Sequence, residues 1–288
     1  YAIEFGGVAS STATAALPTG VDAKEVRIAG IETVSVLSEG TGYVSNSIKL
    51  DDANARTLTI TGSKDLTVAF SSNAGFGATP NTSTGIGGVS SVDASAATGV
   101  ITIDTTNLVA ATAGLTIQTG SGADSITLTQ AATVLAGAGN DTIVTPAAKA
   151  TLTLGAGVDT VNAASSVVPT LSSTAATEVE ATTSLITITD LAVGDKIDFS
   201  SGTTTAQTTL GIATSTGSAT TLLAALNALA NASAAVTWGT YGGNTYIVYD
   251  AAATTSGGVL ATDVVVKLTG IVDLTNATFD TAGVLTVA

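Results

Sequence analysis

Alternating apolar and polar residues predict short β-strands along much of the chain. The alternation runs for only a few residues at a time and is interrupted by polar or glycine-rich turns, which is typical of half-buried strands. The upstream strands are expected at residues 30–36, 55–60, 65–70, 91–93 and 100–104. We expect them to be irregular coils of one solenoid, because a stack of coils buries small side chains of each coil against the next. Residues 73–88 are expected to form a projecting loop.

The last ninety residues have a different pattern. Residues 219–230 place four leucines on one stripe, which predicts an amphipathic helix. Residues 235–250 alternate around Gly242-Gly243 and predict a hairpin, in which Trp238 is expected to be a core aromatic rather than a binding platform. Residues 263–274 predict closing strands.

A repeat occupies the middle of the chain. Residues 120–126, 137–143 and 155–161 each read G-x-G-x-D-x-U, where U is a large aliphatic residue. The repeated glycines and aspartates are Gly120, Gly122, Asp124, Gly137, Gly139, Asp141, Gly155, Gly157 and Asp159. Successive aspartates are 17 and 18 residues apart, so a coil of that length would hold two strands. The U side chain is expected inside the coil.

The spacing of this repeat favours a calcium site. Glycines permit tight turns with inward carbonyl oxygens, and an aspartate at a fixed offset adds a hard anionic oxygen. Ca²⁺ prefers about six oxygen ligands without His or Cys. The three loops leave two gaps between successive coils, one between Asp124 and Asp141 and one between Asp141 and Asp159. We therefore predict two calcium ions. The alternative is a Gly-Asp turn in a β-helix that binds no metal.

Composition narrows the possible functions. The 288 residues include no His, Cys or Met, which excludes Ser-His-Asp and Cys-His catalysis, thiolate metal sites and disulfides. The net charge of −14 and only 10% charged residues do not fit nucleic-acid binding. Asp51 and Asp52 are adjacent and would point to opposite faces of a strand. They are therefore expected to be solvent-exposed turn acids rather than a catalytic pair, and we expect no enzymatic activity.

The repeats resemble the RTX nonapeptide G-G-x-G-x-D-x-U-x of type I-secreted bacterial proteins. The first glycine is replaced in each copy, by Thr119, Ala136 and Leu154. Residues 186–199 resemble the segment that follows RTX repeats in many such proteins. Its aspartates either line a further ion site or cap turns by accepting backbone N–H bonds. These aspartates are Asp190, Asp195 and Asp198.

Over the whole chain, the repeats and the Thr-, Ala-, Ser- and Gly-rich composition resemble RTX-type bacterial S-layer proteins. This resemblance implies an all-β parallel β-helix or β-roll, with a β-rich C-terminal cap that contains one short helix. It implies an irregular solenoid over 1–110, a calcium-binding roll over 111–200, and a cap with the secretion signal over 201–288. It also implies export, Ca²⁺ binding and self-assembly into a cell-surface lattice.

Two alternatives remain open: a calcium-dependent adhesin or biofilm protein, and the non-catalytic tail of a secreted enzyme. The chain begins at Tyr1 and has no Met, so we expect it to derive from a longer product. A preceding segment could attach it to cell-surface polysaccharide. The chain contains no uninterrupted stretch of about 20 apolar residues, so no membrane-spanning helix is predicted.

Overall fold

The structure is a computed structural model, and its described part is mostly β. The described residues are 2–5, 20–27, 30–40, 45–52, 54–71, 88–111, 114–146, 149–163, 185–199, 219–230, 232, 236–250, 258–259, 263–280 and 282–288. They form long sheets of parallel strands, which is consistent with the predicted parallel β-helix or β-roll. The chain divides into two compact units, Tyr1–Thr142 and Ile143–Ala288. The predicted divisions after 110 and after 200 remain a prediction.

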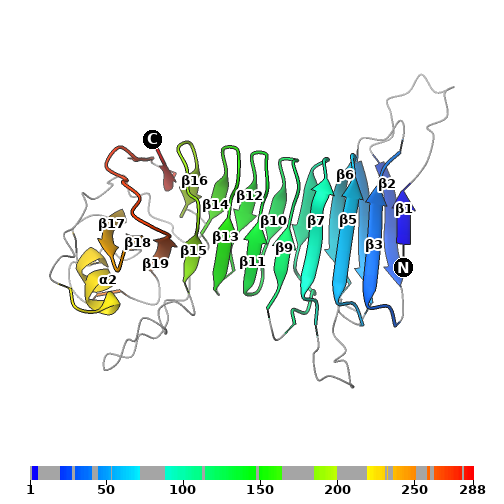
Figure 1. Cartoon of the computed structure of the whole chain (residues 1–288), viewed down its shortest axis with the longest axis horizontal. Helices are drawn as coiled ribbons and strands as arrows, with labels where there is room; N and C mark the ends of the chain where they lie inside the picture. Colours follow the sequence, from blue (N-terminus) through cyan, green and yellow to red (C-terminus); the bar gives the residue numbers. More distant parts are fainter. Residues whose placement is uncertain are drawn as a thin grey trace. The chain divides into compact units, whose positions relative to one another are not determined.

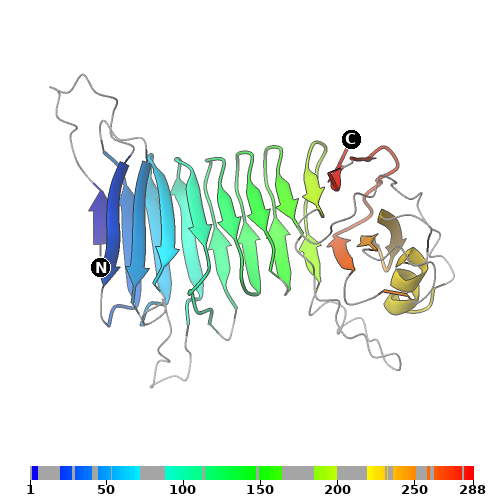
Figure 2. The ribbon, with the colours of Figure 1, turned by 180° about the vertical axis from the view of Figure 1, so that it is seen from behind.

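The first unit is a stack of coils with two strands each. Its strands are β1 (Ala2–Phe5), β2 (Gly20–Arg27), β3 (Thr33–Ser38), β4 (Ser45–Asp51), β5 (Thr57–Gly62), β6 (Asp65–Phe70), β7 (Ser91–Ala97), β8 (Ile101–Asp104), β9 (Thr116–Gln118), β10 (Ser125–Thr127) and β11 (Ala132–Leu135). Odd-numbered strands line up as one sheet and even-numbered strands as the other (Figures 1 and 2). Neighbouring strands within each of these sheets pair in parallel.

The interior of this unit is built from columns of aliphatic side chains in register. In the odd sheet the column is Val34, Leu58, Val92, Ile117 and Val134, all fully buried. In the even sheet, Ile48, Val68, Ile103 and Ile126 form a second buried column. Each such side chain contributes about 1.5–3 kcal/mol when it is buried. Stacking therefore gives a chain with 4% aromatic residues a continuous core.

The second unit begins with parallel strands and ends in antiparallel ones. Strand β12 (Thr142–Val144) begins at the last residue of the first unit. The others are β13 (Ala150–Thr153), β14 (Thr160–Asn162), β15 (Ile186–Ile188), β16 (Lys196–Asp198), β17 (Val236–Tyr241), β18 (Asn244–Tyr249), β19 (Val264–Leu268), β20 (Thr278–Phe279) and β21 (Val284–Thr286). Strands β13, β15 and β19 pair in parallel, and β18 and β17 then add antiparallel. Likewise β14 and β16 are parallel, whereas β21 and β20 add antiparallel.

The helix α2 (Leu222–Ala230) packs on the antiparallel end of this unit. Its residues Leu222, Leu226 and Leu229 join Tyr246 and Val248 in one buried cluster. Figure 1 shows α2 beside β17 and β18. The predicted hairpin is confirmed, and Trp238 is 7% exposed, as expected of a core aromatic. Among the described residues no helix is long and apolar enough to cross a membrane.

Three predictions differ from the structure. Residues 271–274 are not a strand, because β19 ends at Leu268. Strands β1, β2, β4, β20 and β21 were not expected. Asp51 and Asp52 are 3% and 1% exposed, so the expectation that they are solvent-exposed was wrong. The predicted loop at residues 73–88 lies outside the described residues except for Gly88.

Candidate functional site

Stacked glycine loops bring the backbones of neighbouring coils into direct contact. Gly137 and Gly139 have φ values of 96° and 130°, in the region that favours glycine. A Cβ on Gly137 would collide with the carbonyl oxygen of Gly120, and one on Gly139 with that of Gly122. The Ala138 N–H donates to the Gly120 carbonyl oxygen over 2.8 Å. Close stacking therefore requires Gly137 and Gly139 whether or not a metal binds.

Close stacking of this kind is also present one coil earlier, where the full motif is absent. A Cβ on Gly120 would collide with the carbonyl oxygen of Ala97, and one on Gly122 with that of Gly99. Residues 97–101 therefore occupy the place of a glycine loop. Ile101 pairs in register with the position of Asp124, because Thr102 pairs with Ser125. This loop was not predicted from the sequence, because only Gly99 and Ile103 match the motif and its first glycine and its aspartate are replaced by Ala97 and Ile101.

Each motif aspartate of the first unit accepts a hydrogen bond from a backbone N–H group of the preceding coil. Asp124 and Asp141 are both 1% exposed. Asp124 Oδ1 accepts the Ile101 N–H over 2.7 Å, and Asp141 Oδ1 accepts the Asp124 N–H over 2.7 Å. A hydrogen bond to a charged group is among the stronger ones in proteins. These carboxylates therefore help to hold successive coils together, and we call this arrangement the aspartate column.

The second unit contains a similar arrangement of its own at Asp195. Asp195 Oδ1 accepts the Asp159 N–H over 3.0 Å, and Asp195 Oδ2 accepts the Ala192 N–H over 2.8 Å. Asp190 similarly accepts the N–H groups of Leu154 and Gly155, one on each oxygen, both over 2.8 Å. Both oxygens of Asp190 and of Asp195 thus accept backbone N–H groups, and only the bond from Ala192 to Asp195 lies within a single turn, as in a turn cap. Asp198 lies in β16 opposite Asn162 and is half-buried.

Asp124 differs from Asp190 and Asp195 in its second oxygen. Asp124 Oδ2 is buried and makes no hydrogen bond. Burial raises the pKa of Asp124 above its ordinary value, and the negative charge of Asp65 adds to the rise. The Ile101 N–H, the Thr119 hydroxyl and the Gly120 N–H oppose the rise in pKa. The latter two lie near the carboxyl group without a hydrogen bond of normal geometry to Oδ2. The charged form of Asp124 thus lacks full compensation.

The aspartates and glycines of these loops offer the types of ligand atom that calcium binds. The donors are carboxylate and carbonyl oxygens, which are the ligands that Ca²⁺ takes. The unbonded Oδ2 of Asp124 is an oxygen that a cation would compensate. Within the described ranges there is no group of three or more His, Cys, Asp or Glu side chains that could hold a metal. Backbone carbonyl groups and water would therefore have to supply most ligands.

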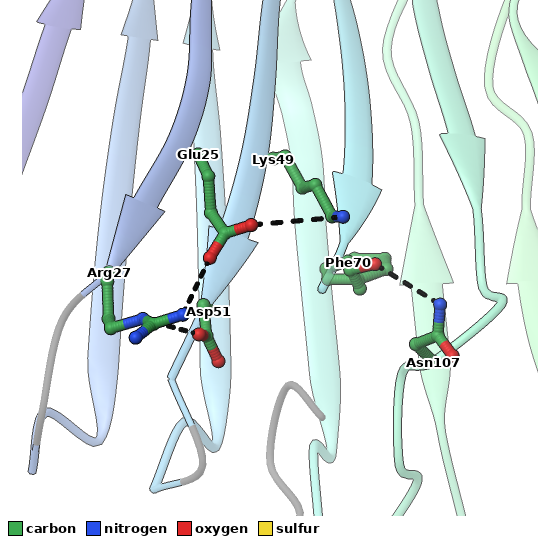
Figure 3. A network of polar contacts seen from close by, with 6 residues as sticks. All are labelled: Glu25, Arg27, Lys49, Asp51, Phe70 and Asn107. Carbon is green, nitrogen blue, oxygen red and sulfur yellow. Dashed lines mark hydrogen bonds and ion pairs between the residues drawn. The ribbon is translucent and has the colours of Figure 1, made fainter. Parts of the chain in front are cut away.

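A second group of charged residues lies on β2 and β4, around the buried Asp51 (Figure 3). Arg27 Nε donates to Asp51 Oδ2 over 2.8 Å, and Arg27 Nη2 pairs with Glu25 Oε1 at 3.0 Å. Lys49 Nζ lies 3.9 Å from Glu25 Oε2. Asp51 ends β4 and Asp52 follows it, so strand alternation no longer separates their environments. The signal available in the sequence was the concentration of charged residues between 22 and 52, in a chain with few charges.

Asp52 is the least compensated acid of this second group. Its Oδ1 accepts the Asn54 N–H over 3.0 Å, whereas its Oδ2 is buried without a hydrogen bond. Burial raises the pKa of Asp52, and the backbone N–H groups of Asn54 and Ile31 and the charge of Arg56 oppose that rise.

A further contact in Figure 3 joins two coils. Asn107 Nδ2 donates a hydrogen bond to the Phe70 carbonyl oxygen over 3.4 Å.

Comparison with known proteins does not place the chain in a family. No family model matches it, and no curated protein matches it.

Proposed function

We propose that this chain is a structural cell-surface protein that is exported by type I secretion and assembles into a calcium-dependent two-dimensional S-layer. The proposal is supported by the resemblance of the three glycine repeats to RTX repeats. It is also supported by a composition without His or Cys, which suits a structural role better than catalysis. The parallel stack adds a third argument, because coils of this kind present long lateral faces for contacts between copies.

The observation that carries the calcium part is the buried Oδ2 of Asp124, which makes no hydrogen bond. A buried carboxylate that lacks a partner on one oxygen costs free energy in its charged form. Asp124, Asp141 and Asp159 would provide carboxylate oxygens, and the loop glycines would provide carbonyl oxygens. Bound Ca²⁺ would supply the positive charge that compensates these buried carboxylates.

Compensation of buried carboxylate charge by bound Ca²⁺ suits a protein that must cross a secretion channel before it folds. At cytosolic calcium, charge repulsion among the buried carboxylates disfavours the stacked loops. Extracellular modules bind calcium with Kd of about 10⁻⁴–10⁻³ M. Calcium at about 100 times Kd would add about 2.7 kcal/mol per site. We therefore expect calcium to act as a folding switch outside the cell.

The deciding experiment is a CaCl₂ titration of the purified chain, reversed with EGTA and repeated with MgCl₂ as control. Circular dichroism follows β structure, light scattering follows assembly, and negative-stain microscopy examines the product. A calcium-specific gain of β structure followed by ordered two-dimensional arrays is the expected result. Calcium-dependent folding of a lasting monomer would point to an adhesin or an enzyme tail. No response to calcium would leave the loops as ordinary turns and end the S-layer proposal.

A further inference from the structure

Thr119 stands directly before Gly120, at the position where the first repeat has lost its first glycine. It follows strand β9 and is 2% exposed. The corresponding residues of the other two repeats are Ala136 and Leu154, which have no hydroxyl group. Among the three repeats, only the first therefore has a side-chain oxygen at this position.

The next coil fixes the Thr119 side chain. Thr119 Oγ1 donates a hydrogen bond to the Ala136 carbonyl oxygen over 2.7 Å, and the Thr119 backbone N–H donates to the Leu135 carbonyl oxygen over 2.9 Å. A hydroxyl group has one hydrogen to donate and two lone pairs that accept. Because the bond to Ala136 uses that hydrogen, Thr119 Oγ1 has only lone pairs left for other contacts.

The Asp124 carboxyl group lies beside this hydroxyl, close enough for Thr119 to influence the pKa of Asp124. Asp124 is 1% exposed, and its Oδ2 is buried without a hydrogen bond. The hydrogen of Thr119 is directed to Ala136 and does not compensate this oxygen. Two neighbouring buried oxygens thus present lone pairs, an arrangement that costs free energy unless a positive charge compensates it.

We propose that the Thr119 hydroxyl oxygen is a further ligand of the calcium ion that Asp124 binds. This inference rests on the proposed function and adds a residue to the ligand set of that site. A hydroxyl oxygen is a hard, neutral ligand of the type that Ca²⁺ and Mg²⁺ accept. The bond to the Ala136 carbonyl oxygen orients Thr119 Oγ1, as hydrogen bonds behind metal ligands commonly do.

This arrangement couples calcium binding to the contact between two coils. A cation at Thr119 Oγ1 polarises the O–H group, and polarised hydrogen bonds become stronger. The bond from Thr119 to Ala136, which joins the loops of the first and second repeats, is therefore stronger with calcium than without it. A glycine at position 119 would offer neither the ligand nor the bond.

The test measures the free energy of unfolding in urea, at calcium concentrations from below to well above Kd. T119V removes the hydroxyl group and is expected to raise the Kd of one site about tenfold. Its loss of stability relative to the wild type should therefore grow with calcium, by about 1.4 kcal/mol in total. T119S keeps a hydroxyl group and should follow the wild type at every calcium concentration.

T145V is the matched control for the lost hydrogen bond. Thr145 is also 2% exposed, and its Oγ1 donates to the Asn162 carbonyl oxygen of another coil over 3.1 Å. It lies four residues beyond Asp141, at the far end of β12. T145V should therefore lower stability by the same amount at every calcium concentration.

A double-mutant cycle with D124N determines whether the two oxygens bind one ion. In the D124N background, T119V should still lose the bond to Ala136, but its effect should no longer depend on calcium. A calcium-dependent effect of T119V that persists in this background would overturn the inference, because the hydroxyl group would then act on a different site.

Two further results would overturn it: a T119V effect that is constant with calcium, as for T145V, or no recovery in T119S. If the wild type still gained stability with calcium, either result would leave the proposed function intact. A wild type that gained no stability with calcium would instead end the calcium proposal and this inference together.

Discussion

At the scale of single residues, glycine serves this chain in two separable ways, as a residue with positive φ and as one without a Cβ. Gly114 has φ +109° with open space around it, Gly120 lacks a positive φ but abuts the preceding coil, and Gly137 combines both. Alanine at Gly114 should cost about 1 kcal/mol through backbone strain alone. Alanine at Gly120 should cost more, because two backbones must separate. G137A should cost about 3 kcal/mol or more.

Urea denaturation of the three alanine variants measures this order. G114A serves as the control for strain, and G120A as the control for contact. If G114A were as damaging as G137A, conformational strain and not close stacking would explain the glycines of the repeats.

Asp52 should make stability depend on pH in a direction opposite to that of a salt-bridged acid. Its folded pKa is raised above 3.8, so the folded chain binds the proton more tightly than the unfolded chain does. Its contribution to stability therefore falls as pH rises from 3.8 through the folded pKa, and it is constant above that. D52N removes this titration and keeps an oxygen for the Asn54 N–H.

The relevant measurement is the difference in free energy of unfolding, D52N minus wild type, across this pH range. Because the other carboxyl groups are common to both chains, their titration cancels. The difference should increase with pH and then level off. A difference that decreases with pH would show that Asp52 is better compensated in its charged form than its burial indicates.

At the scale of elements, α2 should depend on the leucines of its buried face. Leu226 is 1% exposed and belongs to the cluster with Tyr246 and Val248, whereas Leu223 is only half-buried. L226A should therefore cost about 2–5 kcal/mol. L223A makes the same chemical change in the same helix and should cost about 1 kcal/mol. Equal losses, measured by chemical denaturation, would contradict the assignment of Leu226 to the core.

The elements show what periodicity can predict in a chain of this kind. Strands such as β6 and the β17–β18 hairpin were predicted because they alternate and have clear turns. Strand β4 was missed because its outward positions hold Ser45, Ser47 and Lys49 and only two large aliphatic residues face inward. Strand β2 was missed because its charges obscure the alternation. Both are stabilised by neighbouring coils, which local sequence does not reveal.

The candidate site was predictable only in part for a similar reason. The spacing of the aspartates placed Asp124 and Asp141 on neighbouring coils, which the structure confirms. It did not reveal that one oxygen of each is bonded to a backbone N–H of the preceding coil. Nor did it reveal that Ile101 continues the column without a carboxylate. Those features depend on the register between strands far apart in sequence.

At the scale of the whole molecule, calcium should act on stability through linkage. Once the calcium concentration exceeds the Kd of a site, that site adds about 0.6 kcal/mol to the free energy of unfolding for each unit increase in ln[Ca²⁺]. The two predicted ions therefore give a slope of about 1.2 kcal/mol. D124N removes the carboxylate whose Oδ2 is buried without a hydrogen bond. The variant should therefore lower the slope by about the contribution of one ion.

D195N is the matched control for this measurement, because both Asp195 oxygens already accept backbone N–H groups. It should lower stability at every calcium concentration through the loss of a cap, yet leave the slope unchanged. The slope thus separates metal binding from structural damage, which a single melting temperature cannot do. If D124N and D195N changed stability by constant amounts and the wild-type slope were zero, backbone hydrogen bonds alone would hold the aspartate column. The stack of coils would then fold equally well inside the cell and outside it.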